Sequence, residues 1–312
     1  MNDLTPTISV CIATYKRPQL LKKLLLSLTQ QQTKGEFTFT IVVADNDAQR
    51  SAEPIVQAFN ARGQQIIYAV EPEQNISLAR NRALSLSTGE YIATIDDDEY
   101  ATPEWLLNLY RTLTTYKADV VHGPVLPNFP SQTPYYIREC QIFRPPNPPT
   151  GSTEKYAIGT GNSLFRRQMI QGMALPFDPQ FGLTGGEDNV FFNHLQHGGA
   201  RMTWCREAVV FETVPSSRAN LLWTLKRAFR YGIIGPRVRS CSALDLGKVM
   251  RAAYEIVRLS CAALMCASVG IAIPRYAVKA MLYLVDDLQL IALRLGNMAC
   301  YAGLRYEEYR GR

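Results

Sequence analysis

Short apolar runs alternate with amphipathic segments through the first 95 residues, and this alternation restricts the fold more than any other feature. The apolar runs lie at residues 7–14, 39–44, 66–70 and 91–95, with amphipathic segments between them. Runs of this length suit strands buried on both faces, and helices are the usual connections between parallel strands. The pattern predicts an α/β fold, with a mostly parallel sheet flanked by helices.

Polar residues stand at the end of each predicted strand. Ligands collect at the carboxyl ends of the strands in such sheets, so these residues are candidates for a binding site. They are Thr14, Arg17, Asp45, Asn75 and the run from Asp96 to Glu99. The segment around Asp45 is also a good turn sequence by itself. The agreement of four strand ends therefore carries the prediction.

Four consecutive carboxylates at residues 96–99 follow the last of these strands. Carboxylates crowded at the end of a buried strand repel one another and lose hydration, so a cation or a set of donors has to compensate them. The alternative is a helix cap, because acidic residues also suit the start of a helix near Trp105. A cap needs one carboxylate and this run supplies four. We therefore predict a divalent-metal site whose oxygen ligands favour Mg²⁺ or Mn²⁺ over zinc.

A second acidic pair, Glu187 and Asp188, follows two glycines at the start of a predicted helix. A carboxylate at this position can act as a general base toward an acceptor hydroxyl, and helix capping is again the alternative. In combination, one acidic set would hold a leaving group and the other would activate a nucleophile. His122, at the end of a further predicted strand at 119–122, is a minor candidate for the pocket lining.

Charge is distributed unevenly along the 312 residues. Residues 217–312 contain 15 Lys/Arg and 6 Asp/Glu, a net charge of +9, whereas residues 1–216 carry −3. A basic tail can bind nucleic acid, anionic lipid or a phosphorylated ligand. Its basic residues are interleaved with apolar stretches such as 261–273, which favours a lipid surface.

The apolar stretches of the tail are not suited to crossing a bilayer. Residues 261–273 number 13, whereas a spanning helix needs about 20. Residues 281–295 include Asp286 and Asp287, which would be costly at the membrane centre. We expect interfacial helices, with a soluble helical subdomain as the alternative.

Two features of the sequence indicate the cytoplasm. The seven cysteines are dispersed and form no CxxC pair, and the N-terminus has no signal-peptide regions.

Residues 126–157 are rich in proline and predict a long irregular connection, of the kind that forms a mobile substrate loop. No GxxxxGK[ST] or GxGxxG motif follows a strand, so phosphate-loop and dinucleotide interpretations have no support.

Five motifs support a resemblance to a known family. They are VCIATYKRP at 10–18, VVADND at 42–47, NISLARN at 75–81, IDDDE at 95–99 and GGED at 185–188. In this order and spacing the chain resembles family 2 glycosyltransferases of GT-A fold over about residues 7–215. The segments at 87–91, 123–125 and 226–232 are most similar to bacterial β-1,4-glucosyltransferases that build the lipid-linked repeat unit of succinoglycan-type exopolysaccharides.

The resemblance implies a GT-A domain at 1–216, with a nucleotide-sugar half at about 1–125 and an acceptor half at about 126–216. A basic amphipathic helical tail that associates with the membrane follows at 217–312. The residues implied to bind the nucleotide sugar are Thr14, Arg17, Asp45, Asn75, Arg80, Asp96 and Asp97. Asp98, together with Asp96, would hold the metal.

Further roles follow from the same resemblance. Asp188 would be the base for an in-line, inverting attack, and Glu187 would orient the donor or acceptor, although the choice of base within this pair is left open. Arg227 and Arg230 would contact the acceptor or its phosphates.

The expected activity is metal-dependent transfer of glucose from UDP-glucose to an undecaprenyl-diphosphate-linked oligosaccharide at the cytoplasmic face of the bacterial inner membrane. Nucleic acid is not an expected partner. The QxxRW signature of processive synthases is missing, so we expect a single sugar to be added per encounter. The alternatives are a nucleotidyltransferase that releases pyrophosphate and a non-catalytic membrane scaffold that binds a nucleotide sugar.

Overall fold

The computed structural model describes residues 5–153, 159–238, 246–272 and 276–304. Within these residues the chain forms two compact units. The first comprises Met1–Leu126 and Pro146–Glu212, and the second comprises Pro127–Pro145 and Thr213–Glu308, apart from the positions outside the described ranges. The predicted functional division at residue 216 remains a prediction.

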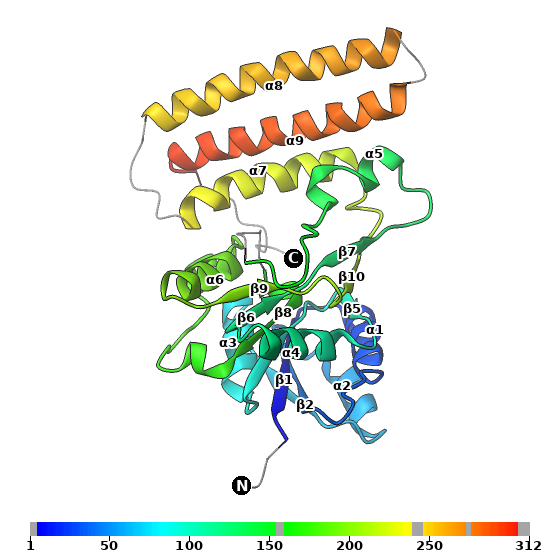
Figure 1. The fold of residues 1–312 in the computed structure, drawn as a ribbon, viewed down its shortest axis with the longest axis vertical. Helices are drawn as coiled ribbons and strands as arrows, with labels where there is room; N and C mark the ends of the chain where they lie inside the picture. Colours follow the sequence, from blue (N-terminus) through cyan, green and yellow to red (C-terminus); the bar gives the residue numbers. More distant parts are fainter. Residues whose placement is uncertain (1–4, 154–158, 239–245, 273–275, 305–312) are drawn as a thin grey trace. The chain divides into compact units, whose positions relative to one another are not determined.

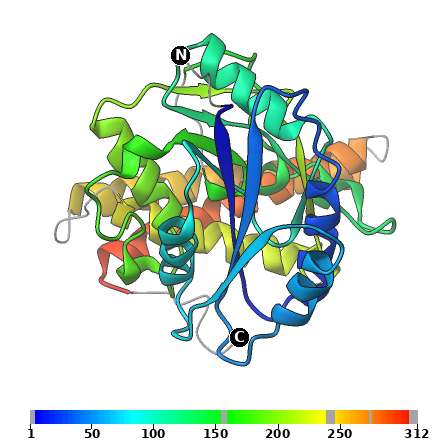
Figure 2. The ribbon, with the colours of Figure 1, turned by 90° about the horizontal axis from the view of Figure 1, so that it is seen from below.

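The first unit contains a seven-stranded sheet in the order β3-β2-β1-β4-β8-β6-β9. The strands are β1 (Thr7–Thr14), β2 (Thr38–Asp45), β3 (Ile66–Val70), β4 (Tyr91–Thr94), β6 (Val120–His122), β8 (Ser163–Arg166) and β9 (Met202–Trp204). All neighbouring pairs are parallel except those of β8, which is antiparallel to β4 and β6. Figure 2 shows β1, in dark blue, and β2, in a lighter blue, side by side in this sheet. The mostly parallel sheet predicted from the sequence is confirmed.

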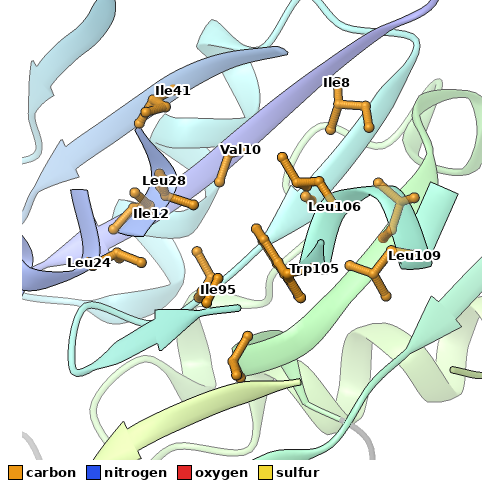
Figure 3. Packing of buried hydrophobic residues seen from close by; sticks show 14 of the residues in the cluster. Ile8, Val10, Ile12, Leu24, Leu28, Ile41, Ile95, Trp105, Leu106 and Leu109 are labelled. Atoms are coloured by element: carbon orange, nitrogen blue, oxygen red, sulfur yellow. The ribbon is translucent and has the colours of Figure 1, made fainter. Parts of the chain in front are cut away.

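Helices cover both faces of this sheet. Helices α1 (Pro18–Leu28), α2 (Glu53–Asn60) and α4 (Trp105–Thr115) share one hydrophobic core with the sheet, and α3 (Ile76–Leu86) and α6 (Glu187–His197) share the other. In the first core the fully buried Trp105 packs among apolar side chains of β1 and α1 (Figure 3). Each large apolar side chain buried in this way contributes about 1.5–3 kcal/mol to stability.

The register of the sheet brings the predicted polar residues to one edge. Thr14 at the end of β1 is paired with Asp45 at the end of β2, and β4 ends two residues before Asp96. Because neighbouring parallel strands end at the same edge, these side chains gather there.

The predicted irregular connection at 126–157 contains short regular elements, so the prediction was wrong at these places. They are the end of β7 (Val125–Asn128), the helix α5 (Tyr135–Arg138) and the 3₁₀ turn η1 (Gln141–Phe143). In the second unit Ile137 and Phe143 from these turns are buried against Val214 and Val285. Packing of this kind stabilises short helical turns that the proline-rich sequence by itself does not predict.

Further short elements among the described residues are strands and 3₁₀ turns. They are β5 (Glu99–Ala101), β10 (Val210–Thr213), η2 (Thr160–Asn162), η3 (Arg167–Ile170) and η4 (Pro179–Phe181). The strands β5, β10 and β7 form a second sheet in that order, in which β5 and β10 are antiparallel.

Three long helices dominate the second unit, namely α7 (Leu221–Val238), α8 (Leu246–Ala272) and α9 (Ala277–Tyr301), and α9 packs between the other two (Figure 1). Helices α7 and α9 touch through their backbones. A Cβ atom added to Gly232 would overlap the carbonyl oxygen of Leu293, and one added to Gly296 would overlap that of Phe229. Over the described positions, no helix combines the length and apolar character needed to cross a membrane.

Candidate active site

Asp97 is held by two donors from the end of β1. Thr14 Oγ1 donates to Asp97 Oδ2 at 2.8 Å, and Arg17 Nη1 donates to Asp97 Oδ1 at 2.9 Å. Arg17 also reaches Asp98 Oδ2 at 3.1 Å. Burial raises the pKa of Asp97 to about 6, although Arg17 and Thr14 act in the opposite direction. Part of the acidic run is therefore compensated by protein donors.

Arg17 reaches this position because helix α1 begins at Pro18, directly after it. Proline suits the first position of a helix, since its φ is fixed and its missing N–H is not needed there. The turn between β1 and α1 is consequently short. It leaves the guanidinium of Arg17 at the carboxyl edge of the sheet.

Arg80 on α3 joins the two acidic motifs. Its Nη2 donates to Asp96 Oδ1 at 2.9 Å, and its Nη1 donates to Glu187 Oε1. The side chain of Arg80 is 10% exposed and that of Glu187 4%, whereas the side chain of Asp96 is 42% exposed. Asp96 thus presents its carboxylate toward solvent, while Glu187 is turned inward.

Asp188 has the accessible carboxylate of the second acidic pair. Gly185 and Gly186 adopt φ angles of 78° and 96°, which only glycine accepts easily, and they set the start of α6 at Glu187. Asp188 is half-buried, and its Oδ1 accepts from the backbone N–H of Asn189 at 2.7 Å and from Asn189 Nδ2 at 2.9 Å. Among the described residues, Asp188 Oδ2 takes part in no hydrogen bond, whereas Oδ1 takes part in two.

At two glycines the backbone lies close to carboxylates of the acidic motifs, those of Asp188 and Glu99. A Cβ atom added to Gly159 would lie 2.8 Å from Asp188 Oδ2, and one added to Gly161 would overlap Glu99 Oε1. Neither glycine was predicted from the sequence as a site residue. The available signal was their alternation directly before β8, because glycine beside a strand often marks a close approach of backbone.

His122 supports this glycine segment and is not placed to act as a base. Its Nδ1 lies 2.7 Å from Ser163 Oγ, which donates to the carbonyl oxygen of Gly159 at 2.7 Å. Because the Ser163 proton is used in this way, His122 Nδ1 is the donor. Burial lowers the pKa of His122 to about 3, so its ring stays neutral at physiological pH.

Asp45 lies at the expected strand end but already accepts three hydrogen bonds. Its oxygens accept from the backbone N–H groups of Asp47 at 3.1 Å and Ala52 at 2.8 Å, and from Tyr68 Oη at 2.9 Å. The residue is fully buried. Its contact with the nucleotide sugar remains a prediction. The structure adds a second role, because these hydrogen bonds fix the turn after β2.

Asn75 caps helix α3, a role that the sequence analysis did not assign to it. Its Oδ1 accepts from the backbone N–H groups of Ser77 at 3.0 Å and Leu78 at 3.2 Å. Its Nδ2 donates to the carbonyl oxygen of Pro179 at 3.1 Å. Asparagine directly before an apolar helix is the usual signal for such a cap.

The two predicted metal ligands are each paired with an arginine, Asp96 with Arg80 and Asp98 with Arg17. Among the described residues, no group of three or more His, Cys, Asp or Glu side chains is arranged to hold a metal ion. Mg²⁺ is often held by one or two carboxylates together with substrate phosphates, and the assignment of Asp96 and Asp98 to such a site remains a prediction. Glu99 faces inward and accepts from the backbone N–H of Asp96 at 2.9 Å, and burial raises its pKa well above the usual value.

Arg227 and Arg230 belong to the second unit. Arg227 Nε donates to Tyr231 Oη at 3.0 Å, and Arg230 is buried beside the same ring, 5.6 Å from its centroid. Their predicted contact with an acceptor or phosphate remains a prediction.

Solved structures share this architecture. The mannosyltransferase PcManGT from Pyrobaculum calidifontis, in complex with GDP-Man and Mn²⁺, has a TM-score of 0.64 and 16% identity, and the match covers 95% of this chain and 88% of that one. S. aureus TarS 1–349 in complex with UDP-GlcNAc has a TM-score of 0.56 and 17% identity, with 95% and 92% covered. The fold is therefore of the GT-A class.

Sequence comparison gives the family. The family model described as glycosyl transferase family 2 matches residues 9–173. The succinoglycan biosynthesis protein ExoM of Rhizobium meliloti is 32% identical over 287 residues, which is 91% of this chain and 92% of the relative. The chain belongs to glycosyl transferase family 2, and it is a glycosyltransferase. The nucleotidyltransferase and scaffold alternatives lose their support.

Proposed function

We propose that this protein is an inverting, metal-dependent glycosyltransferase that moves glucose from UDP-glucose to a lipid-linked oligosaccharide in exopolysaccharide biosynthesis. The observation that carries the proposal is the connection of Asp96 to Glu187 through Arg80, which joins the acidic run to the residue preceding Asp188. The similarity to a succinoglycan biosynthesis protein supports the acceptor class, and the UDP-GlcNAc complex of TarS supports a uridine nucleotide.

The donor end of the site would be formed by the acidic run and the residues around it. Asp96 and Asp98 would hold Mg²⁺ or Mn²⁺, which would neutralise the diphosphate as it leaves. Arg17 keeps Asp97 and Asp98 in place. The outward orientation of Asp96 leaves a carboxylate accessible to the donor.

Asp188 would take the proton from the acceptor hydroxyl as that oxygen attacks the anomeric carbon. Its Oδ1 is fixed by Asn189, and its Oδ2 is the remaining acceptor. Attack from the face opposite the departing UDP inverts the configuration at that carbon. Glu187 is unsuited to this role, because its carboxylate is buried and paired with Arg80. This difference supports Asp188 as the proposed base.

A donor panel tests the proposal. The purified protein would be incubated with Mn²⁺ or Mg²⁺ and with UDP-glucose, UDP-galactose, UDP-GlcNAc or GDP-mannose, each with and without bacterial lipid extract. We expect UDP release from UDP-glucose that increases when lipid-linked acceptor is present. Release only from GDP-mannose, or none with any donor, would contradict the proposed donor.

Substitution of Gly159 by alanine should slow transfer without unfolding the protein. Gly159 has φ −146° and ψ 178°, a conformation that alanine accepts, so the added methyl group acts mainly by displacing Asp188 Oδ2. A misplacement of about 1 Å in a catalytic group can cost about 100-fold in rate, and we expect a loss of about 10- to 100-fold. Initial rates of UDP release and the melting temperature would be measured together.

The matched control is Gly198→Ala at the end of α6. Gly198 has φ −74°, and its nearest contact for an added Cβ atom is 3.3 Å. This variant should keep nearly full activity. Equal rates for Gly159→Ala and the wild-type enzyme would show that this glycine does not position Asp188.

Helix α8 offers a surface for the membrane partner. One face of the helix exposes six apolar side chains, namely Met250, Tyr254, Val257, Cys261, Leu264 and Met265. The first five are spaced three or four residues apart, and Met265 directly follows Leu264. We call these residues the α8 stripe. The opposite face is buried through Ala252, Leu259 and Ala263. Arg251 and Arg258 are exposed beside the stripe, in a tail with net charge +9. An apolar face flanked by cations suits the surface of an anionic bilayer.

The double variant Val257→Glu/Leu264→Glu should lose binding to anionic vesicles. Burial of each such side chain is worth about 1.5–3 kcal/mol, so we expect the bound fraction to fall at least about tenfold. Flotation with vesicles of phosphatidylglycerol and phosphatidylcholine measures the effect. Leu175→Glu, at an exposed leucine of the first unit, is the control. Unchanged flotation of the double variant would remove the α8 stripe as the lipid contact.

A further inference from the structure

Helix α3 is bonded at several points to the segment that leads into α6. Asn81 Nδ2 donates to the carbonyl oxygen of Phe177 at 2.7 Å, and Asn81 Oδ1 accepts from the Phe177 N–H at 2.9 Å. Ser77 Oγ donates to the carbonyl oxygen of Asp178 at 2.8 Å, and Asn75 donates to Pro179. Helix α3 is therefore a fixed platform for the chain that approaches Glu187.

Arg80 extends from this platform to both acidic motifs. Its guanidinium lies 5.8 Å from the ring centroid of Phe177, and its two terminal nitrogens separately contact Asp96 and Glu187. The planar fork of arginine fixes two carboxylates in defined directions, which a lysine ammonium group does not do. Glu187 is almost fully buried, and a buried carboxylate needs such a partner.

We propose that Arg80 is a positioning residue that sets the start of α6 against the acidic run, and so places Asp188 relative to the bond that breaks. This inference rests on the proposed function, and it replaces the expected contact of Arg80 with the nucleotide. Asp188 follows Glu187 directly in the first turn of α6. Movement of the Glu187 carboxylate therefore shifts the base.

The kinetic test separates positioning from nucleotide binding. Arg80→Lys keeps the positive charge but loses the fork, and Glu187→Gln keeps the shape but loses the negative charge. Each should lower kcat about 10- to 100-fold, the cost of a small misplacement of the base, with less than threefold change in KM for UDP-glucose. The dissociation constant of UDP, measured by calorimetry, should also change less than threefold.

A double variant tests whether the two residues act as one unit. Arg80→Gln/Glu187→Gln should lower kcat about as much as Arg80→Gln alone, because the same connection is lost in both. Arg82→Gln, at an exposed arginine on the same helix, should leave kcat and KM unchanged. Additive losses in the double variant would overturn the proposal. So would an unchanged kcat together with a raised KM or UDP dissociation constant in Arg80→Lys.

Hydrogen exchange provides a readout that does not depend on transfer. The amides at residues 185–190 should exchange faster in Arg80→Lys than in the wild-type protein, while those of α1 stay unchanged. Unchanged exchange at the start of α6 would overturn the positioning role even if the rates fell. If the wild-type protein releases no UDP from any donor, the proposed function fails, and the exchange result still decides whether Arg80 holds α6.

Discussion

Asp188→Asn should strongly reduce sugar transfer while leaving the donor bound. The substitution keeps the size of the side chain but removes the ability of Oδ2 to take a proton from the acceptor hydroxyl. General-base catalysis contributes about 10²- to 10⁴-fold, so we expect kcat to fall by at least about 100-fold. Single-turnover transfer from UDP-glucose would be measured alongside calorimetric binding of UDP.

The matched control for this substitution is Asp178→Asn. Asp178 also lies at the start of a helical turn and accepts from the backbone N–H of Gln180 at 2.8 Å, but it belongs to neither acidic motif. It should keep most of the activity. A folded Asp188→Asn protein with wild-type kcat would refute Asp188 as the base.

Asp98→Ala should lose both transfer and the metal dependence of donor binding. The change removes a carboxylate proposed to hold the cation. Of the two aspartates that Arg17 contacts in the acidic run, only Asp97 would remain. Removal of one group that stabilises developing charge costs about 10²- to 10³-fold in kcat, and we expect a loss in this range or larger. Titration of UDP in the presence and absence of Mn²⁺ would measure the binding effect.

Glu104→Gln is the control for Asp98, since Glu104 is an exposed carboxylate a few residues further along. It should leave both the rate and the effect of Mn²⁺ unchanged. Retention of full metal-stimulated activity by Asp98→Ala would rule out this residue as a metal ligand.

Local sequence patterns were sufficient to predict the parallel part of the sheet. The runs at 7–14 and 39–44 are mostly apolar, and strands of this kind suit a parallel sheet that is covered by helices on both faces. The carboxyl edge followed from this arrangement, because Thr14 and Asp45 end neighbouring strands in register. These predictions depended on short segments and on one general rule of α/β topology.

The partners of individual side chains could not be predicted in this way. Arg80 meets Glu187, which lies 107 positions further along the chain, and no local pattern encodes that distance. The close approach of Gly159 to Asp188 likewise depends on how β8 and α6 pack. Asn75 shows the reverse case, since its local cap signal was present but was interpreted only as a ligand contact.

The tail illustrates a different limit. Interfacial helices were expected there because the apolar stretches are too short to cross a bilayer, and three long helices are present among the described residues. Which apolar residues pack inward was not predictable, because α8 has apolar residues on both its buried and its exposed faces. The turns α5 and η1 were missed for a related reason. They are stabilised by packing against residues such as Val285, far away in the sequence.

The central claim is inverting transfer of glucose, and product analysis tests it most directly. The enzyme would be incubated with ¹³C-labelled UDP-glucose, Mn²⁺ and lipid-linked acceptor, and the products would be identified by nuclear magnetic resonance. We predict one equivalent of UDP for each glucose transferred and a β-linked glucose from the α-linked donor. An α-linked product, or release of a nucleotide product other than UDP, would contradict the account.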